Sequence, residues 1–160
     1  MNRFTDYQIR PARPEDADLL APHLREIDCR ELWALSRLEP GEGLRLSLKC
    51  SVSAWTAETG GEIIQIWGVS RLGGLLDFVG QPWLLGSDIL ERPEVAREFI
   101  RRSRACAREL EAGFRRLENV VHAENRLAVR WLKWLGFTFA PEPARVNHEN
   151  FYLFWKWTQG

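Results

Sequence analysis

Two ionisable side chains stand together where an apolar segment gives way to a polar one. His122 and Glu124 follow the apolar pair Val120 and Val121 and precede Asn125. An imidazole titrates near neutral pH, and a carboxylate can take up a proton directly or through water, so either residue could act as a general base. The alternation of polar and apolar residues does not fix the side to which His122 points. The alternative is a histidine that is solvated or hydrogen-bonded at the end of a strand.

Other features of the sequence exclude several classes of protein. Cys29, Cys50 and Cys106 are far apart and form no Cys-x-x-Cys or Cys/His cluster, so no metal site is expected. Lys and Arg together number 22, as do Asp and Glu, and the resulting zero net charge argues against nucleic-acid binding. The segment Met1–Arg10 lacks the apolar stretch of a signal peptide, and no run approaches the ~18 apolar residues of a membrane span. We therefore expect an intracellular protein with reduced thiols.

The elements that position these side chains are indicated by the spacing of apolar residues and by turn residues. Strands are expected over 7–10, 53–58, 62–71, 81–86, 117–123, 137–139 and 151–157, and helices over 17–27, 29–35, 42–50, 93–113 and 125–135. Gly60-Gly61 predicts a hairpin turn, and the prolines at 141 and 143 predict a loop. Asp28 is expected to cap the second helix, with Glu31 as its partner in a capping box.

The order of these elements predicts the fold class. A strand, helices, three strands, a long helix, a strand, a helix and two strands make a mixed central β-sheet of six to seven strands, with helices on both faces. A length of 160 residues suits one α/β domain over residues 1–160. The eight tryptophans either fill the core or, alternatively, present an aromatic surface to a partner protein.

This order, with three short motifs, resembles the GNAT superfamily of N-acetyltransferases along nearly the whole chain. The motifs are Arg10-Pro11-Ala12 with Asp16, Gly60-Gly61-Glu62 leading to Gly68-Val69, and Asn125-x-x-Ala128 followed by Gly136-Phe137. A narrower resemblance, from Trp83 to Phe139, is to the GNAT-like proteins of tailed bacteriophages, a group that includes internal virion proteins of short-tailed phages. That resemblance implies a location in the cytoplasm of a bacterial host cell or in the virion.

The resemblance also implies acyl-CoA-dependent N-acyltransfer with acetyl-CoA as the donor. In such proteins the strand before the long helix diverges from its neighbour and pairs with the pantetheine arm; here that strand holds Trp83, Leu84, Leu85 and Gly86. The following loop binds the pyrophosphate at a helix N-terminus, where Arg92 and Arg97 lie, and Asn125 borders the same site. The amine of a small molecule or protein would attack the thioester, with His122 or Glu124 as its base.

The chain departs from the family pattern at two places. The loop over 86–93 has no Gly-x-Gly, Pro93 lacks an N–H, and Asp88, Glu91 and Glu94 place negative charge beside a pyrophosphate or, alternatively, stabilise the helix N-terminus. Seven residues after Asn125, where many members carry a tyrosine as general acid, this chain has Leu132. The alternative function is therefore a catalytically degenerate GNAT fold that serves as a virion or assembly component and docks on a phage structural protein or a host protein.

A basic stripe marks the long helix. Arg97, Arg101, Arg104 and Arg108 recur at helical spacing. Three interpretations are open for this stripe: a solvated face paired with nearby glutamates, a contact for the 3′-phosphate of CoA, and a docking surface for an acidic partner.

Overall fold

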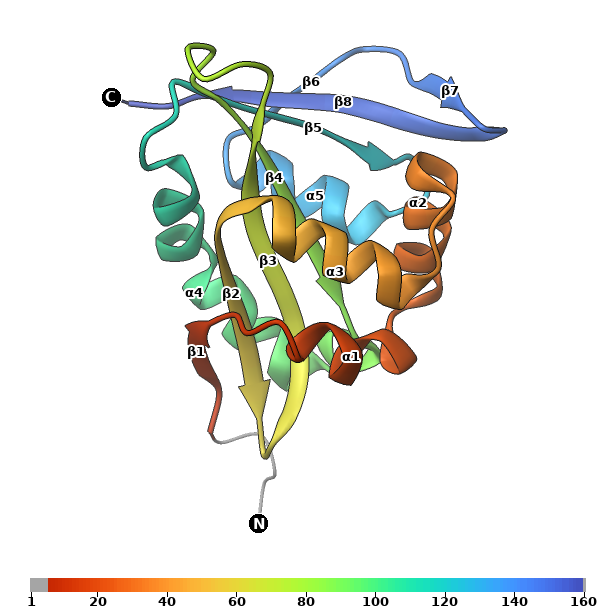
Figure 1. Cartoon of the computed structure of the whole chain (residues 1–160), viewed down its shortest axis with the longest axis vertical. Helices are drawn as coiled ribbons and strands as arrows, with labels where there is room; N and C mark the ends of the chain where they lie inside the picture. Colours follow the sequence, from red (N-terminus) through yellow and green to blue (C-terminus); the bar gives the residue numbers. More distant parts are fainter. Residues whose placement is uncertain (1–5, 160) are drawn as a thin grey trace.

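An eight-stranded mixed sheet forms the centre of the computed structural model, which describes residues 6–159 (Figure 1). Met1–Thr5 and Gly160 lie outside the described residues. The expectation that residues 1–10 are not a signal peptide therefore falls partly outside them. The strands are β1 (Gln8–Pro11), β2 (Ser51–Thr59), β3 (Glu62–Leu72), β4 (Val79–Gly86), β5 (Arg116–His122), β6 (Thr138–Phe139), β7 (Ala144–Val146) and β8 (Glu149–Trp157). Their order is β1-β2-β3-β4-β5-β8-β6, with β7 paired to β8. All neighbours are antiparallel except β4 and β5.

Helices cover both faces of this sheet, as the sequence predicted (Figure 1). The helices are α1 (Asp16–Leu20), α2 (Glu26–Ser36), α3 (Pro40–Cys50), α4 (Pro93–Glu111) and α5 (Arg126–Trp134), with 3₁₀ turns η1 (Ala21–His23) and η2 (Asp88–Glu91). Leucines of α1, α2 and α3 pack with β3 and β4 in one apolar cluster. Side chains of α4 and α5 pack with the opposite face of the sheet in a second cluster. The two clusters hold α2 and α3 on one side of the sheet and α4 and α5 on the other.

The predicted α/β fold class is confirmed, but the strand count is higher than predicted. The prolines at 141 and 143 lie in a loop, as predicted, but the residues after Pro143 add the short strand β7, because Ala144 pairs with Phe151 and Val146 with Glu149 of β8. The first predicted helix, over 17–27, is interrupted after Leu20, since Pro22 stands in the 3₁₀ turn η1 and cannot continue an α-helix. Its last two residues instead begin α2, which contains the second predicted helix, over 29–35.

The predicted cap at Asp28 is wrong. Helix α2 begins at Glu26 after Arg25, and Asp28 lies inside its first turn with 1% of its surface exposed. The Asp28 carboxylate accepts hydrogen bonds from the Arg25 guanidinium at 2.9 and 3.0 Å and from the Gly86 N–H at 3.0 Å. Asp28 therefore joins the start of α2 to the end of β4 instead of capping a helix.

The hairpin turn predicted at Gly60-Gly61 and the helix predicted over 125–135 are confirmed in detail. Gly60 and Gly61 have φ angles of 56° and 82°, the positive values that a tight hairpin turn needs. Asn125 caps α5, because its Oδ1 accepts a hydrogen bond from the Ala128 N–H at 3.3 Å, and Gly136 follows the helix with φ of 93°. No helix within residues 6–159 is both long and apolar enough to cross a bilayer.

Candidate functional site

The sheet splits between β4 and β5. These parallel strands pair only at Val79 with Arg116 and at Gly80 with Leu117. A methyl group on Gly80 would lie 2.8 Å from side-chain atoms of Leu117, so a glycine allows the two strands to meet there. Beyond that point β4 stays paired with β3 as far as Gly86, and β5 stays paired with β8 as far as His122. The two strands therefore separate toward their C-terminal ends, as the family resemblance implies.

An asparagine side chain closes the narrow end of this split. The Asn119 Nδ2 donates to the Pro82 carbonyl at 2.6 Å, and its Oδ1 accepts from the Gln81 Nε2 at 3.3 Å. These bonds take the place of the backbone pairing that stops at Gly80. Further along β4, the Gly86 N–H and carbonyl point away from β3 and bind Asp28 and the Arg25 N–H. Leu84 has the same parity along the strand, so its N–H and carbonyl face the split, where an extended ligand could pair with them.

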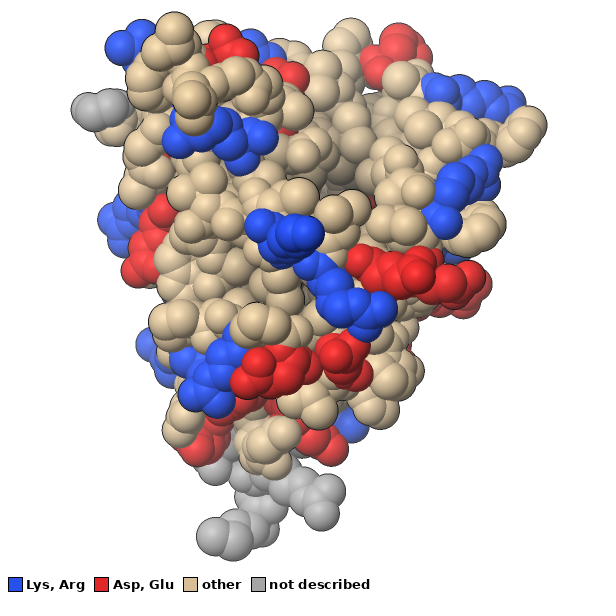
Figure 2. All heavy atoms as spheres, viewed as in Figure 1, with Lys and Arg blue, Asp and Glu red and all other residues tan. Residues whose placement is uncertain are grey.

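A cavity of about 580 Å³ passes through the split and has walls on both faces of the sheet. On the α4 and α5 side, its walls include Phe99, Ile100, Ala128 and Trp131. On the α2 and α3 side, they include Leu32, Leu35, Leu46 and Trp83. Figure 2 shows the surface hollowed near the top of the molecule, between the β3–β4 loop and α2. A ligand on one face of the sheet could thus meet a second ligand on the other.

Three buried polar atoms of the cavity wall have no hydrogen-bond partner within the described part of the chain. They are the Oε1 of Gln65 and the indole Nε1 atoms of Trp67 and Trp131. A buried donor or acceptor without a partner costs about 1–3 kcal/mol. Two donors and one acceptor would be satisfied by a ligand with amide groups. The two amides of a pantetheine arm are of this kind, so the wall of the cavity fits that part of acyl-CoA.

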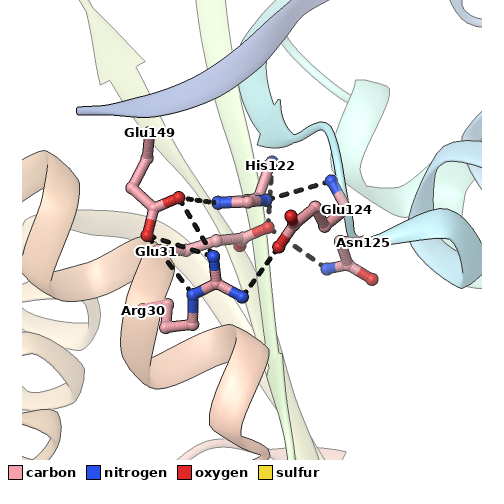
Figure 3. A network of polar contacts seen from close by, with 6 residues as sticks. All are labelled: Arg30, Glu31, His122, Glu124, Asn125 and Glu149. Atoms are coloured by element: carbon pink, nitrogen blue, oxygen red, sulfur yellow. Dashed lines mark hydrogen bonds and ion pairs between the residues drawn. The ribbon is translucent and has the colours of Figure 1, made fainter. Parts of the chain in front are cut away.

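Glu31 of α2 is the only carboxylate among the described residues that line the cavity. Its Oε1 accepts hydrogen bonds from the His122 backbone N–H at 3.0 Å and from the Asn125 Nδ2 at 3.2 Å (Figure 3). Burial, with a further contribution from the negative charge of Asp28, raises the pKa of Glu31 to about 7. A carboxyl group that titrates near neutral pH and borders a cavity can exchange a proton with a bound ligand.

The two bases predicted from the sequence lie beside Glu31, and neither lines the cavity (Figure 3). His122 is 1% exposed, its Nδ1 accepts a hydrogen bond from the Glu124 N–H at 3.0 Å, and its Nε2 lies 2.8 Å from Glu149. With Nδ1 as the acceptor, the ring proton sits on Nε2 and is donated to Glu149. The Glu124 carboxylate is exposed and forms an ion pair with Arg30 at 2.8 Å. A catalytic role for either residue stays a prediction, and this geometry makes Glu31 the better-placed base.

Of the seven cofactor-binding residues predicted from the sequence, four line the cavity and three do not. Trp83, Leu84, Leu85 and Asn125 line the cavity. Gly86 is the last residue of β4 and does not line the cavity. Its N–H donates to Asp28, and its carbonyl accepts from the Arg25 N–H.

Arg92 and Arg97 are exposed and lie outside the cavity wall. Arg97 stands two turns before Arg104, whose guanidinium lies 4.2 Å from the ring of Trp134 in α5. Residues two turns apart share one side of a helix, so Arg97 lies on the edge of α4 nearest α5. A contact between Arg97 and a phosphate group stays a prediction. Arg101, by contrast, is bonded to Glu98 at 3.0 Å, so part of the basic stripe is a paired surface.

The predicted pyrophosphate loop contains the 3₁₀ turn η2 and then the Pro93 start of α4. Within this loop the Leu90 N–H bonds to the Ser87 carbonyl and the Arg92 N–H to that of Ile89. Asp88, Glu91 and Glu94 are exposed around the helix start. This loop therefore offers fewer amides and more negative charge than a phosphate ligand favours.

Sequence reasoning missed Glu31 as a functional residue. Asp28, Glu31, Leu32 and Leu35 recur at the spacing of one helix face, so two acids share a face with two leucines. An acid on the apolar face of a helix is a signal of a buried carboxylate. The pattern does not predict which groups bind the Glu31 carboxylate, because His122 and Asn125 are more than ninety residues away. No cluster of three or more metal-binding side chains occurs within residues 6–159.

Comparison with known proteins gives a result for the fold alone. No protein-family model matches the sequence, and no curated protein sequence does. Among solved structures, a GNAT-family acetyltransferase from Streptococcus pneumoniae matches with a TM-score of 0.63 at 16% identity, over 96% of this chain and 100% of that one. An N-acetyltransferase from Staphylococcus aureus matches at 0.66 and 11% identity, over 96% and 99% of the two chains. A spermidine N-acetyltransferase from Vibrio cholerae, in complex with CoA and spermine, matches at 0.64 and 12% identity, over 94% and 95%. The chain therefore has the GNAT fold.

Proposed function

We propose that this protein transfers an acyl group from acyl-CoA to an amine. The observation that carries the proposal is the cavity that passes through the β4–β5 split with Glu31 in its wall. An opening through the sheet lets a thioester and an amine approach from opposite faces and meet at the split. The similar structures of N-acetyltransferases, one of them with CoA and spermine, support the same assignment at the level of the fold.

The donor would lie on the α4 and α5 side. Its pantetheine arm would pair with the Leu84 backbone groups that face the split and with the atoms of Gln65, Trp67 and Trp131 that have no partner among the described residues. Arg97 would contact a phosphate at the outer mouth. The acidic η2 loop implies that the arm and not the pyrophosphate supplies most of the affinity.

The transfer itself requires one base. The amine nitrogen attacks the thioester carbonyl carbon and forms a C–N bond, and the C–S bond breaks with its electron pair left on sulfur. Before the attack, the ammonium form of the substrate passes one proton to Glu31, directly or through one water, and the proton that the nitrogen loses after the attack goes to the CoA thiolate. Glu31 suits the role because a base is most effective when its pKa is close to the working pH.

His122 and Glu149 would act as positioning residues. The His122 backbone N–H binds the Glu31 carboxylate, and the ring of His122 is held by Glu149 and by the Glu124 N–H. His122 and Glu124 as direct bases remain testable alternatives to Glu31.

A second candidate function is binding without catalysis, and two observations favour it. Leu132, at the position where many family members carry a tyrosine acid, is only 7% exposed within the apolar core. Asp88, Glu91 and Glu94 surround the start of α4. In this alternative the fold serves as a virion or assembly component of a tailed phage, with a phage structural protein or a host protein as its partner.

One experiment separates the two functions. Titration calorimetry with acetyl-CoA tests donor binding, and release of free thiol on addition of an amine tests transfer. We expect binding, and we expect thiol release that Glu31→Gln lowers about a hundredfold without weakening acetyl-CoA binding. His122→Ala and Glu124→Ala, measured alongside, test the other two bases. If millimolar acetyl-CoA gives no heat and no thiol, the transferase proposal is wrong and the binding role remains.

A further inference from the structure

The half of the cavity that lies on the α2 and α3 side has mainly apolar walls. Leu32 and Leu35 come from α2, Leu46 comes from α3, and Trp83 and Val120 come from the two strands at the split. Leu35 and Leu46 keep 46% and 48% of their surface exposed, so they stand at the mouth rather than in the core. Polar groups on this side are small: the hydroxyls of Ser36 and Ser47, for instance, also border the cavity.

Glu31 supplies the only uncompensated charge on this side among the described residues that line the cavity. Arg25 also borders it, but its guanidinium is buried and paired with Asp28 at 2.9 Å. The other two lining arginines belong to the opposite side: Arg71 lies over the ring of Phe114 and Arg102 over the ring of Tyr7, both members of the α4-side core. A ligand on the α2 and α3 side therefore meets one carboxylate and otherwise mainly apolar walls.

This charge pattern selects among amines. One ammonium group can pair with Glu31 and pass its proton to that carboxylate. A second ammonium group on the same molecule would lose water against leucine and tryptophan walls without a second carboxylate, which is unfavourable. An alkyl or aryl body, in contrast, would be stabilised by burial of its apolar surface against Leu35 and Leu46.

We propose that the acyl acceptor is a primary amine with a single positive charge on an apolar body, seated between α2 and α3 with its nitrogen toward Glu31. The proposal rests on the proposed acyl transfer and adds to it the class of acceptor. It predicts a preference opposite to that of a polyamine acetyltransferase, although the fold is shared with one.

Hexylamine and hexamethylenediamine test the proposal, because they have the same length and differ by one terminal amine. Acyl transfer from acetyl-CoA is measured as kcat/KM for each amine. Binding of each amine without acetyl-CoA is measured separately, by the fluorescence change of tryptophan and by calorimetry. We expect hexylamine to be favoured by about tenfold or more in both measurements, the ratio that about 1.4 kcal/mol produces.

Variants at the mouth make the test specific to the site. Leu46→Glu and Leu35→Glu add a carboxylate where the second amine would lie, and each should shift the preference about tenfold toward the diamine. Leu19→Glu is the matched control, since Leu19 of α1 is 60% exposed and lies outside the cavity wall. It should leave the preference unchanged.

The outcomes distinguish this proposal from the proposed function. Equal affinities, a preference for the diamine, or no binding of either amine would overturn the acceptor class. Preferential binding of hexylamine with no thiol release from acetyl-CoA would support the binding site and its ligand class but refute acyl transfer. If Leu19→Glu shifts the preference between the two amines as much as Leu46→Glu does, general surface charge determines selectivity. The half of the cavity on the α2 and α3 side then does not.

Discussion

Replacement of Glu31 by glutamine should make the protein more stable at alkaline pH and less active. Glutamine keeps a side-chain oxygen that can accept the hydrogen bonds from the His122 N–H and the Asn125 Nδ2. It removes the charge that burial disfavours. The substitution therefore separates the cost of an ionised carboxylate from the loss of its hydrogen bonds.

The size and the pH window of the effect follow from the pKa of Glu31, which is raised from 4.5 to about 7 in the folded protein. At low pH the carboxyl group is protonated in both folded and unfolded chains, and its effect is zero. As pH rises above the unfolded value, the unfolded chain releases this proton first, so the folded state loses stability until pH exceeds the folded value. A pKa difference of one corresponds to about 1.4 kcal/mol, so wild-type protein loses up to about 3 kcal/mol across this window.

Denaturant unfolding of the wild type and of Glu31→Gln, at about pH 5 and about pH 8, measures this effect. The gain in the free energy of unfolding from the substitution should be larger at the higher pH by about 2 kcal/mol or more. Glu26→Gln is the matched control, because it removes an exposed carboxylate from the first turn of the same helix. In parallel, kcat/KM of the wild type should fall as pH drops below about 7, and this acidic limb should disappear in Glu31→Gln.

Two results would contradict a raised pKa of Glu31 or its role as the base. A stability difference between wild type and Glu31→Gln that is the same at both pH values would show that Glu31 does not carry a raised pKa. An acidic limb retained in Glu31→Gln but lost in His122→Ala would show that the imidazole is the base.

Two further predictions concern the walls of the site, and a third concerns the packing of β3 against β2. Trp131→Phe removes a buried indole N–H that has no partner within residues 6–159. Acetyl-CoA should bind up to about tenfold more weakly in calorimetry, with little loss of stability in unfolding experiments. Trp134→Phe, at an exposed position of the same helix, should change neither. Asn125→Ala should lower the free energy of unfolding by about 1 kcal/mol through loss of the α5 cap. It should also move the acidic limb of kcat/KM to higher pH, because the bond from Asn125 lowers the pKa of Glu31. Asn125→Ser should restore the stability but should not return the acidic limb to its wild-type pH. Gly68→Ala should cost about 1–3 kcal/mol of unfolding free energy, because its methyl group would lie 2.7 Å from the Ser53 carbonyl oxygen, whereas Gly74→Ala, whose nearest contact is 3.5 Å away, should cost about 0.5 kcal/mol or less.

Much of the fold was predictable because its signals act over a few residues. Asn125 caps α5 through a bond to the amide three residues on, and Gly60-Gly61 turns the β2–β3 hairpin through positive φ angles. The apolar residues of α4 recur at helical spacing and the side chains of β8 alternate as in a strand, so each pattern predicts its own element. The helix break at Pro22 was not foreseen, and the cap predicted at Asp28 was wrong because a buried ion pair with Arg25 holds that carboxylate.

The site was predictable only in part. The divergence of β4 and β5 was expected from the family resemblance, and Trp83, Leu84 and Leu85 do lie along it. The role of Asn119 in closing the split was not foreseen, because its bonds run to Gln81 and Pro82 on a strand that is distant in sequence. His122 and Glu124 were selected for their chemistry, but the structure turns them toward Glu149 and Arg30.

The sequence by itself thus determined the elements and the order in which they build a GNAT-fold sheet, because sterics, caps and apolar periodicity operate between near neighbours. Only the tertiary structure decided which carboxylate borders the cavity. Burial in the folded chain and the negative charge of Asp28 raise the pKa of Glu31, while the bonds from His122 and Asn125, which the fold brings against α2, lower it. Desolvation and electrostatic contact depend on distance in space, and no pattern of neighbouring residues records that distance.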